Sequence, residues 1–408
     1  MTHTEDPLPP KRETPMARLI GIGMGTRFLV DTAKQMFAPF LSIFAAGMGL
    51  DIVALGGWLA VRNAVGITAP AFGALADRIG YRRVLQAELL LSAAGMFLIG
   101  ASHSLWMLAL GMVVMGIGSA AFVPTLQAYL SAMLPYNRRA RGLGIVEYAW
   151  ALANIVGLFA MGYVIALTDW RAPFHILGAG LALSALLFRG ERAAGIVPRS
   201  ASPDSRSALA RLRDSVSFRS NGVSAWATIV VMGLLVIAGI NVSIVYGAWL
   251  QAEYGLRAAA LGATALVIGA ADLCGSVLVS VAVDRLGKRR SVLGGLWALL
   301  VALLLLPFLN RGLALALGGI ALLRFAFEFT IVSLIPLLSE QTPDERGKAL
   351  SLGAVLGLAG GTAASITGPW AYTHHGVAGL AVISVAAAVM GIVVVVAWVR
   401  EAGDRTVK

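Results

Sequence analysis

The sequence predicts an all-α integral membrane protein, with twelve transmembrane helices arranged as two pseudo-symmetric bundles of six. Three observations carry this prediction: the composition, the recurrence of long apolar runs, and the placement of the basic residues. Hydrophobic residues make up 58% of the 408 residues and charged residues only 13%, whereas a soluble protein carries about 25% charged residues. The mean hydropathy of +0.81 is too high for a single globular interior, so lipid must cover much of the surface.

Twelve apolar runs of roughly 20 residues recur along the chain, each long enough to cross a hydrocarbon layer about 30 Å thick. Strands of a transmembrane barrel would be about 10 residues long and would alternate strictly between apolar and polar positions. The runs here do not alternate, so we interpret them as helices. Their centres lie near Ile43, Ile67, Leu91, Val113, Ile155, Ala179, Val236, Ile268, Leu300, Ile320 to Ile331, Val355 and Val389.

The basic residues are distributed unevenly between the two sides of this predicted bundle. Of the 32 Lys and Arg residues, 25 fall in the tails and in the loops that follow even-numbered runs. Only Arg171, Arg257 and Arg311 fall in the opposite loops. Cytoplasmic loops of membrane proteins carry the excess of basic residues, so we expect a multi-pass protein of the cell membrane with both termini in the cytoplasm. The net charge of +11 then reflects topology and contact with lipid headgroups, and no nucleic-acid partner is expected.

The chain divides into two halves around a polar segment. Between the sixth and seventh runs the apolar density falls and Arg, Ser and Pro become frequent, which is typical of a cytoplasmic linker. Within that linker, the pattern around 209–216 fits an amphipathic helix. The predicted organisation is an N-terminal tail (1–18), a first bundle (19–188), the linker (189–221), a second bundle (222–399) and a C-terminal tail (400–408).

A short motif occurs once in each half. The segment GALADRIGYRRVL (73–85) follows the second run, and SVAVDRLGKRRSV (280–292) follows the eighth. Both contain Asp-Arg-x-Gly followed by basic residues. Two repeated halves indicate two bundles that rock around a shared site near the middle of the membrane, as in many carriers.

The first copy resembles the loop signature of the major facilitator superfamily, roughly G-x-L-a-D-R-x-G-R-K-x-x-L. The resemblance covers nearly the whole chain in architecture. It implies a secondary transporter, monomeric as most members are, in which this loop is a latch that stabilises the outward-facing state. Gly73 would allow a close helix approach, Asp77 would accept hydrogen bonds from Arg or from helix N-terminal amides, and Gly80 would permit a tight turn. The implied latch residues are Gly73, Asp77, Arg78, Gly80 and Arg82, with Asp284, Arg285 and Gly287 in the second copy.

Two features depart from the pattern of proton-coupled drug antiporters in this superfamily. Met112 stands where many of them carry a buried Arg in the fourth span. The stretch GLFAMG (157–162) in the fifth span lacks the proline that follows glycine in drug antiporters.

Ionisable residues within the apolar runs are candidate functional residues, because charge at bilayer depth is costly. Arg27, Asp31 and Lys34 in the first run are spaced by four and three residues, which places them on one stripe of a helix. Arg324 and Glu328 in the tenth run are again four residues apart. Each set is either an ion pair that fixes packing or part of a substrate or proton site.

Four further polar residues lie within runs. Arg62 lies in the second run, and Glu147 lies close enough to the cytoplasmic face for either gating or coupling. Asp272 has no basic residue within one turn of its own helix, so it finds one on another helix or carries a proton. Asn241 either lines the site or packs at a helix interface.

No GxxxxGK[ST] sequence is present to bind ATP phosphates, and no metal-ligand spacing occurs among the five His residues. We therefore expect no cofactor and a proton gradient as the energy source. The leading hypothesis is efflux of a small organic solute by proton antiport, with Asp31 as the coupling residue. A second hypothesis is uptake of an organic anion or other metabolite by symport or uniport, favoured by Arg27, Lys34 and Arg62. A membrane enzyme or receptor without transport is the third.

Overall fold

A computed structural model describes residues 16–188 and 217–401; the side chains of Asn137, Ala140 and Asp284 are outside the description. Every regular element in these two ranges is helical. Most of the predicted N-terminal tail, most of the predicted linker with its amphipathic helix, and most of the C-terminal tail lie outside the described residues.

The first half forms six spans, several of them broken near their middle. The spans are α1 with α2, α3 with η1 and α4, α5, α6 with α7, α8 with η2 and α9, and α10. Their bounds are α1 (Met16–Gln35), α2 (Phe37–Gly47), α3 (Ile52–Ala64), η1 (Val65–Thr68), α4 (Ala69–Ile79), α5 (Tyr81–Gly100), α6 (Leu105–Ala120), α7 (Phe122–Met133), α8 (Tyr136–Leu152), η2 (Ala153–Gly157), α9 (Leu158–Leu167) and α10 (Ala172–Leu186).

The second half also forms six spans. Its helices are α12 (Gly222–Tyr254), α13 (Ala258–Leu286), α14 (Lys288–Leu309), α15 (Leu313–Gln341) and α16 (Arg346–Trp398), with the short η3 (Pro343–Glu345) before α16. A non-helical glycine, Gly376 with φ 60°, divides α16 into two spans. Nine helices in the described ranges are long and apolar enough to cross a membrane by length and composition. With α1–α2, α10 and the division of α16, the twelve-helix prediction is confirmed.

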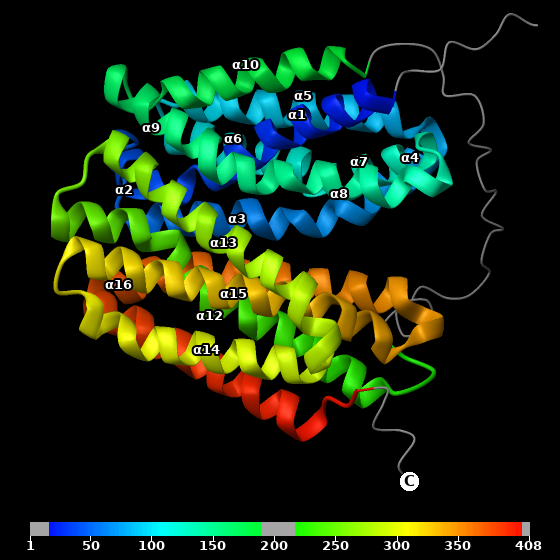
Figure 1. Cartoon of the computed structure of the whole chain (residues 1–408). Helices are drawn as coiled ribbons and strands as arrows, with labels where there is room; N and C mark the ends of the chain where they lie inside the picture. The colour runs from blue at the N-terminus through cyan, green and yellow to red at the C-terminus, as the bar shows by residue number, and fades with distance from the viewer. Residues whose placement is uncertain (1–15, 189–216, 402–408) are drawn as a thin grey trace, which may run out of the picture.

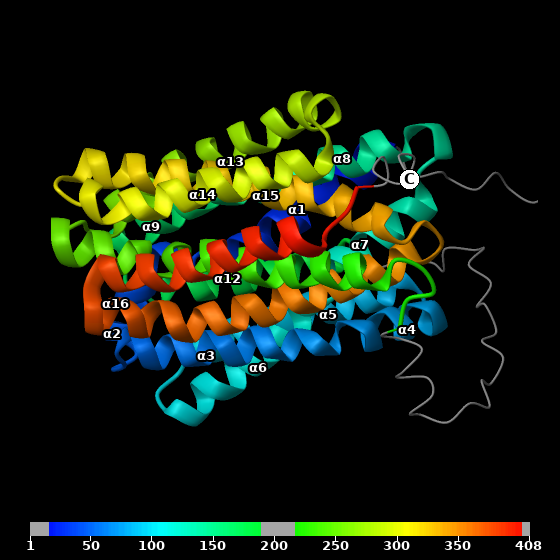
Figure 2. The same cartoon turned by 90° about the horizontal axis from the view of Figure 1, so that it is seen from below.

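The two halves lie side by side and present both described ends of the chain on one face (Figure 1). We call the face that holds Met16 and Glu401 the terminal face, and the opposite one the far face. Seen from below, the second half lies in front and its helices run across the same thickness as those of the first (Figure 2).

The repeated sequence motif forms the same turn in both halves. Gly80 joins α4 to α5 with φ 95°, and Gly287 joins α13 to α14 with φ 87°. Residues with a side chain rarely adopt such positive φ values, whereas glycine adopts them freely. Both turns lie on the terminal face, so the repetition in sequence corresponds to a repetition in structure.

Glycines set the closest helix crossings within each half. A Cβ at Gly95 of α5 would collide with the backbone of Met115 in α6, and one at Gly360 of α16 would collide with the backbone of Gly233 in α12. Close backbone approach at small residues is how helices associate in lipid, where the hydrophobic effect gives no help.

The contacts between the halves are concentrated toward the far face. Extensive contacts join α2 to α12, α3 to α16 and α9 to α13. Gly162 and Gly262 face each other so closely that a Cβ on either would lie within 3.0 Å of the other's Cα. Helix α4, by contrast, lies on the terminal side, and Ala76 is its only buried residue. The conformation is therefore closed at the far face.

Two side-chain hydrogen bonds join the halves in the described ranges. Ser42 of α2 donates to Gln251 of α12 near the far face. Asn63 of α3 donates to Ser365 of α16 across 3.2 Å, near mid-depth. These bonds and the glycine contacts close the path between the cavity described below and the far face.

The α5–α6 crossing gives a test of the packing. In Gly95→Ala, the added methyl group meets the backbone of Met115, and overpacking of this kind costs about 1–3 kcal/mol. We expect a lower thermal unfolding temperature for the protein in detergent. Gly294→Ala is the matched control, because no heavy atom lies within 4 Å of a Cβ at Gly294. Equal melting temperatures for the two variants would contradict the crossing geometry.

Candidate functional site

A cavity of about 340 Å³ lies between the two halves near the middle of the bundle. Its wall is formed by α1, α2, α3 and the α8–α9 region of the first half, and by α12, α13, α15 and α16 of the second. Three basic side chains line it: Lys34 and Arg62 from the first half and Arg324 from the second. No Asp or Glu is among the described residues of the lining.

The two basic residues from the first half form no ion pair with a described carboxylate. Arg62 donates to the carbonyl oxygen of Lys34 across 3.5 Å and to Oδ1 of Asn63 across 3.3 Å. Its guanidinium lies 4.9 Å from the centre of the Phe37 ring. No ion pair within 4.0 Å involves Lys34 or Arg62 in the described part of the chain. Both charges therefore remain available to a ligand in the cavity.

Arg324 on α15 is neutralised by Asp272 on α13. Its Nε donates to Oδ1 across 2.9 Å and its Nη2 to Oδ2 across 2.8 Å, a bidentate pair. The remaining Nη1 donates to Ser243 of α12 across 3.1 Å. Both charged side chains are almost fully buried, so this pair ties three helices of the second half together.

Of the two alternatives for Arg324 and Glu328, an ion pair between them does not form in this structure. Glu328 accepts a hydrogen bond from Ser276 of α13 across 2.9 Å and forms no ion pair with Arg324 within 4.0 Å. The planar guanidinium favours a parallel, two-bond contact with a carboxylate, which Asp272 provides from the facing helix. Asp272 thus has its basic partner on another helix.

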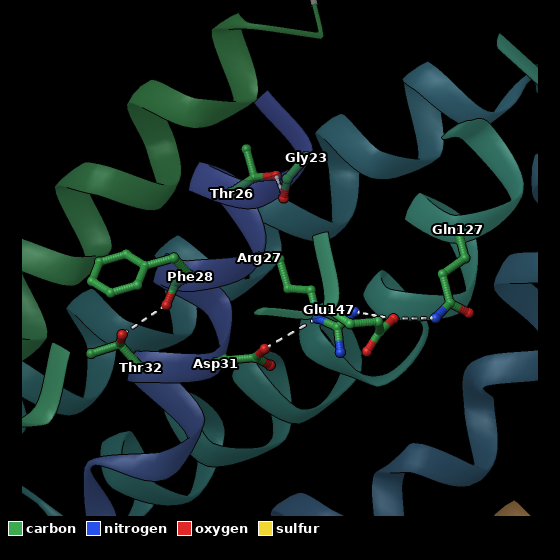
Figure 3. A network of polar contacts seen from close by, with 8 residues as sticks. All are labelled: Gly23, Thr26, Arg27, Phe28, Asp31, Thr32, Gln127 and Glu147. Atoms are coloured by element: carbon green, nitrogen blue, oxygen red, sulfur yellow. Dashed lines mark hydrogen bonds and ion pairs between the residues drawn. The ribbon is translucent and has the colours of Figure 1, made fainter. Parts of the chain in front are cut away.

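A second charged network joins α1 to α7 and α8 inside the first half (Figure 3). Arg27 contacts Oδ2 of Asp31 through Nε at 3.3 Å and Glu147 through Nη1. Gln127 of α7 also donates to Glu147, across 2.8 Å. Arg27 and Asp31 are buried, whereas the Glu147 side chain is 48% exposed. One buried guanidinium therefore bridges two carboxylates, one of them open to solvent.

The stripe predicted on the first span is divided between two environments. Arg27 and Asp31 contact the network within the first half, and only Lys34 lines the cavity between the halves. Asp31 does not line the cavity in this conformation. Any influence of Asp31 on a bound ligand therefore passes through Arg27, Lys34 or movement of α1.

Asn241 lies at a helix interface. It is fully buried in α12, and its Oδ1 accepts a hydrogen bond from Thr367 of α16 across 2.7 Å. It does not line the cavity. Asn241 was expected either to line the site or to pack at a helix interface, and in this structure it packs between α12 and α16.

Two contacts expected of the first latch segment are absent from this conformation. Because the resemblance ties the latch to the outward-facing state, they stay a prediction for that state. No heavy atom lies within 4 Å of a Cβ at Gly73, so no helix approaches there. Asp77 accepts a hydrogen bond from the hydroxyl of Tyr81, one turn away, across 3.1 Å, instead of from an Arg or a helix N-terminus. The physical reason is that the halves meet toward the far face, which leaves α4 exposed on the terminal side.

The other latch residues are also on the terminal face. Arg78 is exposed, and the guanidinium of Arg82 lies 6.0 Å from the ring of Tyr129. In the second copy, Arg285 is exposed and Gly287 forms the turn. The side chain of Asp284 lies outside the described residues.

One buried acid is not among the predicted site residues. Glu88 of α5 has no exposed surface, and its Oε1 accepts a hydrogen bond from Thr125 of α7 across 3.1 Å. A lone acid within an apolar run was the available signal. Its nearness to the basic loop at 78–83 made it resemble an interfacial residue.

The family profile of the Major Facilitator Superfamily matches residues 24–271 and 229–408 of this sequence. The chain belongs to this superfamily. It is a membrane transporter and not an enzyme.

The similar proteins include an uncharacterized transporter, a tetracycline resistance protein and a sugar–proton symporter. The chain is 24% identical to the uncharacterized MFS-type transporter YwfA of Bacillus subtilis, over 96% of this chain and 94% of that one. It is 27% identical to the class C tetracycline resistance protein of Escherichia coli over 74% of each chain. The crystal structure of a D-xylose-proton symporter superposes with a TM-score of 0.73 at 18% identity, covering 95% of this chain and 99% of that chain.

The Asp272–Arg324 pair gives a second test. Asp272→Asn leaves Arg324 buried without a counter-charge, and breaking a buried pair from one side costs about 3–5 kcal/mol. We expect a marked fall in the thermal unfolding temperature. The double variant Asp272→Leu/Arg324→Met removes both charges and should recover most of the loss. A double variant no more stable than Asp272→Asn would contradict the assignment of these two residues as partners.

Proposed function

We propose that the chain exports a small organic anion across the cell membrane in exchange for protons, by alternating access. The supporting observation is the charge of the cavity: Lys34, Arg62 and Arg324 line it, and no described carboxylate does. Arg324 is already paired with Asp272, so the unneutralised charge comes from Lys34 and Arg62.

The electrostatics favour an anionic substrate. Two unit charges 4 Å apart interact by roughly 4 kcal/mol at the effective dielectric constant of about 20 that suits most protein sites. Buried cations without partners are costly, and a carboxylate-bearing ligand would relieve this cost at Lys34 and Arg62 together. The planar guanidinium of Arg62 is suited to bidentate contact with a carboxylate.

The rest of the lining sets the size and character of the substrate. Phe37, Trp150 and Tyr246 contribute aromatic surface, and Asn63 and Asn154 contribute amide groups. A volume of about 340 Å³ is near the lower end of the range for ligand pockets. We infer a compact carboxylate with an apolar or aromatic body.

Proton coupling is assigned to the network around Asp31. Protonation of Asp31 removes its negative charge and weakens its contact with Arg27, which then balances Glu147 alone. The same event removes a negative charge that lies one turn from Lys34 on α1 and, without pairing with it, affects the potential at its ammonium group. Protonation therefore changes both the packing of α1 and the potential in the cavity, and such a difference can shift the population between two conformations.

The direction of transport follows from orientation and membrane potential. The excess of basic residues on the terminal face supports a cytoplasmic location for that face and for both termini. With the far face closed, the cavity would load from the cytoplasm. An interior-negative potential contributes about 2.3 kcal/mol per charge per 100 mV, and it drives anions outward and protons inward. The tetracycline resistance protein among the relatives is compatible with export.

Substrate class can be tested by counterflow in proteoliposomes. We expect exchange to be supported by aliphatic or aromatic carboxylates and not by lipophilic cations or neutral sugars. Lys34→Gln and Arg62→Gln should each raise the KM for the anion tenfold or more, since about 1.4 kcal/mol corresponds to a factor of ten. Arg311→Gln, at an exposed position in a far-face loop, is the matched control. Exchange of cations or sugars alone would rule out the proposed substrate class.

Coupling and direction can be tested in everted membrane vesicles with an acid interior, read by a pH-quenched dye. Addition of the anion should release protons from the lumen of vesicles that contain the wild-type protein. Asp31→Asn should abolish this release while counterflow without a gradient continues. Normal proton release by Asp31→Asn would remove Asp31 from the coupling scheme. Protons that move in the same direction as the anion would instead establish symport.

A further inference from the structure

Glu88 is a buried acid outside the cavity and outside both charged networks. It lies about two turns, or roughly 10 Å, into α5 from the terminal face, and none of its surface is exposed. Thr125 of α7 donates to its Oε1 across 3.1 Å. Its Oε2 has no hydrogen-bond partner.

A second unpartnered oxygen lies one helical turn away. Ser92 of α5 is 2% exposed, and its Oγ also has no hydrogen-bond partner. Residues four apart share one face of a helix, so Glu88 and Ser92 lie on the same face, but Oε2 and Oγ form no hydrogen bond with each other. The backbone of α6 covers them at Gly118, where a Cβ would lie 2.7 Å from both the carbonyl oxygen of Glu88 and Oγ of Ser92.

No counter-charge reaches Glu88 from the helices around it. The described ion pairs do not include it. Helix α6, which packs most extensively on α5, contains no ionisable residue. Arg82 is directed toward Tyr129 of α7, and His175 of α10 stacks on Phe97 toward the far face. The remaining ionisable residues on α5 and on the helices packed against it are Tyr81 and Arg83 of α5, Asp77 and Arg78 of α4, and Arg18, Arg27, Asp31 and Lys34 of α1.

An ionised carboxylate is unstable in these surroundings. Burial penalises the charged form of an acid, and one hydroxyl donor offsets only part of that penalty. A protonated carboxyl, by contrast, carries an O–H donor. With a proton on Oε2, Glu88 is neutral while Oε1 still accepts the hydrogen bond from Thr125. One proton thus removes an unpaired charge from the buried site.

We propose that Glu88 is a second proton-binding site, separate from the Asp31 network and occupied by a proton in the conformation closed at the far face. Because the proton binds where the acid is fully buried, it stabilises this conformation relative to any in which Glu88 reaches water or a cation. Glu88 follows the latch segment on the same helix, so its protonation state is linked to the packing of α5 on α6 and α7. The inference extends the proton-coupled function proposed above, but its test requires no substrate.

The test is infrared spectroscopy of the full-length protein in lipid at neutral pH. A protonated carboxyl has a carbonyl stretching band that a carboxylate lacks. We expect the wild-type spectrum to contain this band and the spectrum of Glu88→Gln to lack that contribution. Glu253→Gln, at an exposed position near the far face, is the matched control and should retain the band. A wild-type spectrum identical in this region to that of Glu88→Gln would overturn the proposal.

A second variant covers the case in which Glu88→Gln does not fold. Thr125→Val removes the hydroxyl that donates to Oε1 of Glu88 and should shift the frequency of the band without abolishing it. An unchanged band in Thr125→Val would then count against the proposal. Neither infrared measurement depends on transport. A protein that does not transport organic anions can still show the Glu88 band, so failure of the proposed function and failure of the Glu88 proposal can be distinguished.

Discussion

The need to neutralise charge inside a low-dielectric bundle organises this protein. In each half, one buried guanidinium is held by carboxylates: Arg27 by Asp31 and Glu147, and Arg324 by Asp272. An uncompensated charge at this depth is costly, so these contacts constrain how the helices of each half pack. Lys34 and Arg62 are the exceptions. Both face the cavity between the halves, and neither forms an ion pair with a described carboxylate.

The two sides of the molecule differ in how the halves meet. Toward the far face, backbone contacts at Gly162, Gly262 and Gly247 bring α9, α13 and α12 against the opposite half. Toward the terminal face, α4 is exposed, and its main contacts are with α5, α7 and η1 of its own half. A rocking motion that separated the far-face glycines would bring the latch segment toward the second half. The charged networks lie within single halves and can persist through that motion.

Much of the fold could be predicted from the sequence, because span length, charge bias and the repeated Asp-Arg-x-Gly motif are local signals. The four-residue spacing of Arg27 and Asp31 also predicted a contact that forms. Arg324 and Glu328 have the same spacing, yet Arg324 pairs with Asp272. A four-residue spacing shows only that two side chains lie close together on one helix. Which carboxylate contacts the guanidinium through both oxygens depends on the helix that packs opposite, here α13 with Asp272.

The cavity and the buried acid could not be predicted in the same way. Whether Lys34 or Asp31 faces the opposite half depends on the rotation of α1 against α8, which is set by packing. Glu88 lies close in sequence to the basic loop, and it is buried because α6 and α7 pack over it. Non-local contacts of this kind leave no pattern in a single sequence.

The most direct measurement of the central claim is ligand-induced thermal stabilisation of the purified protein. A ligand that binds only the folded state raises stability by RT ln(1 + [L]/Kd). The account predicts that compact carboxylates raise the unfolding temperature, that added salt weakens the effect, and that the Lys34→Met/Arg62→Met double variant loses it. Stabilisation by cations or uncharged compounds alone, or equal stabilisation of the double variant by carboxylates, would contradict an anion site built on these two residues.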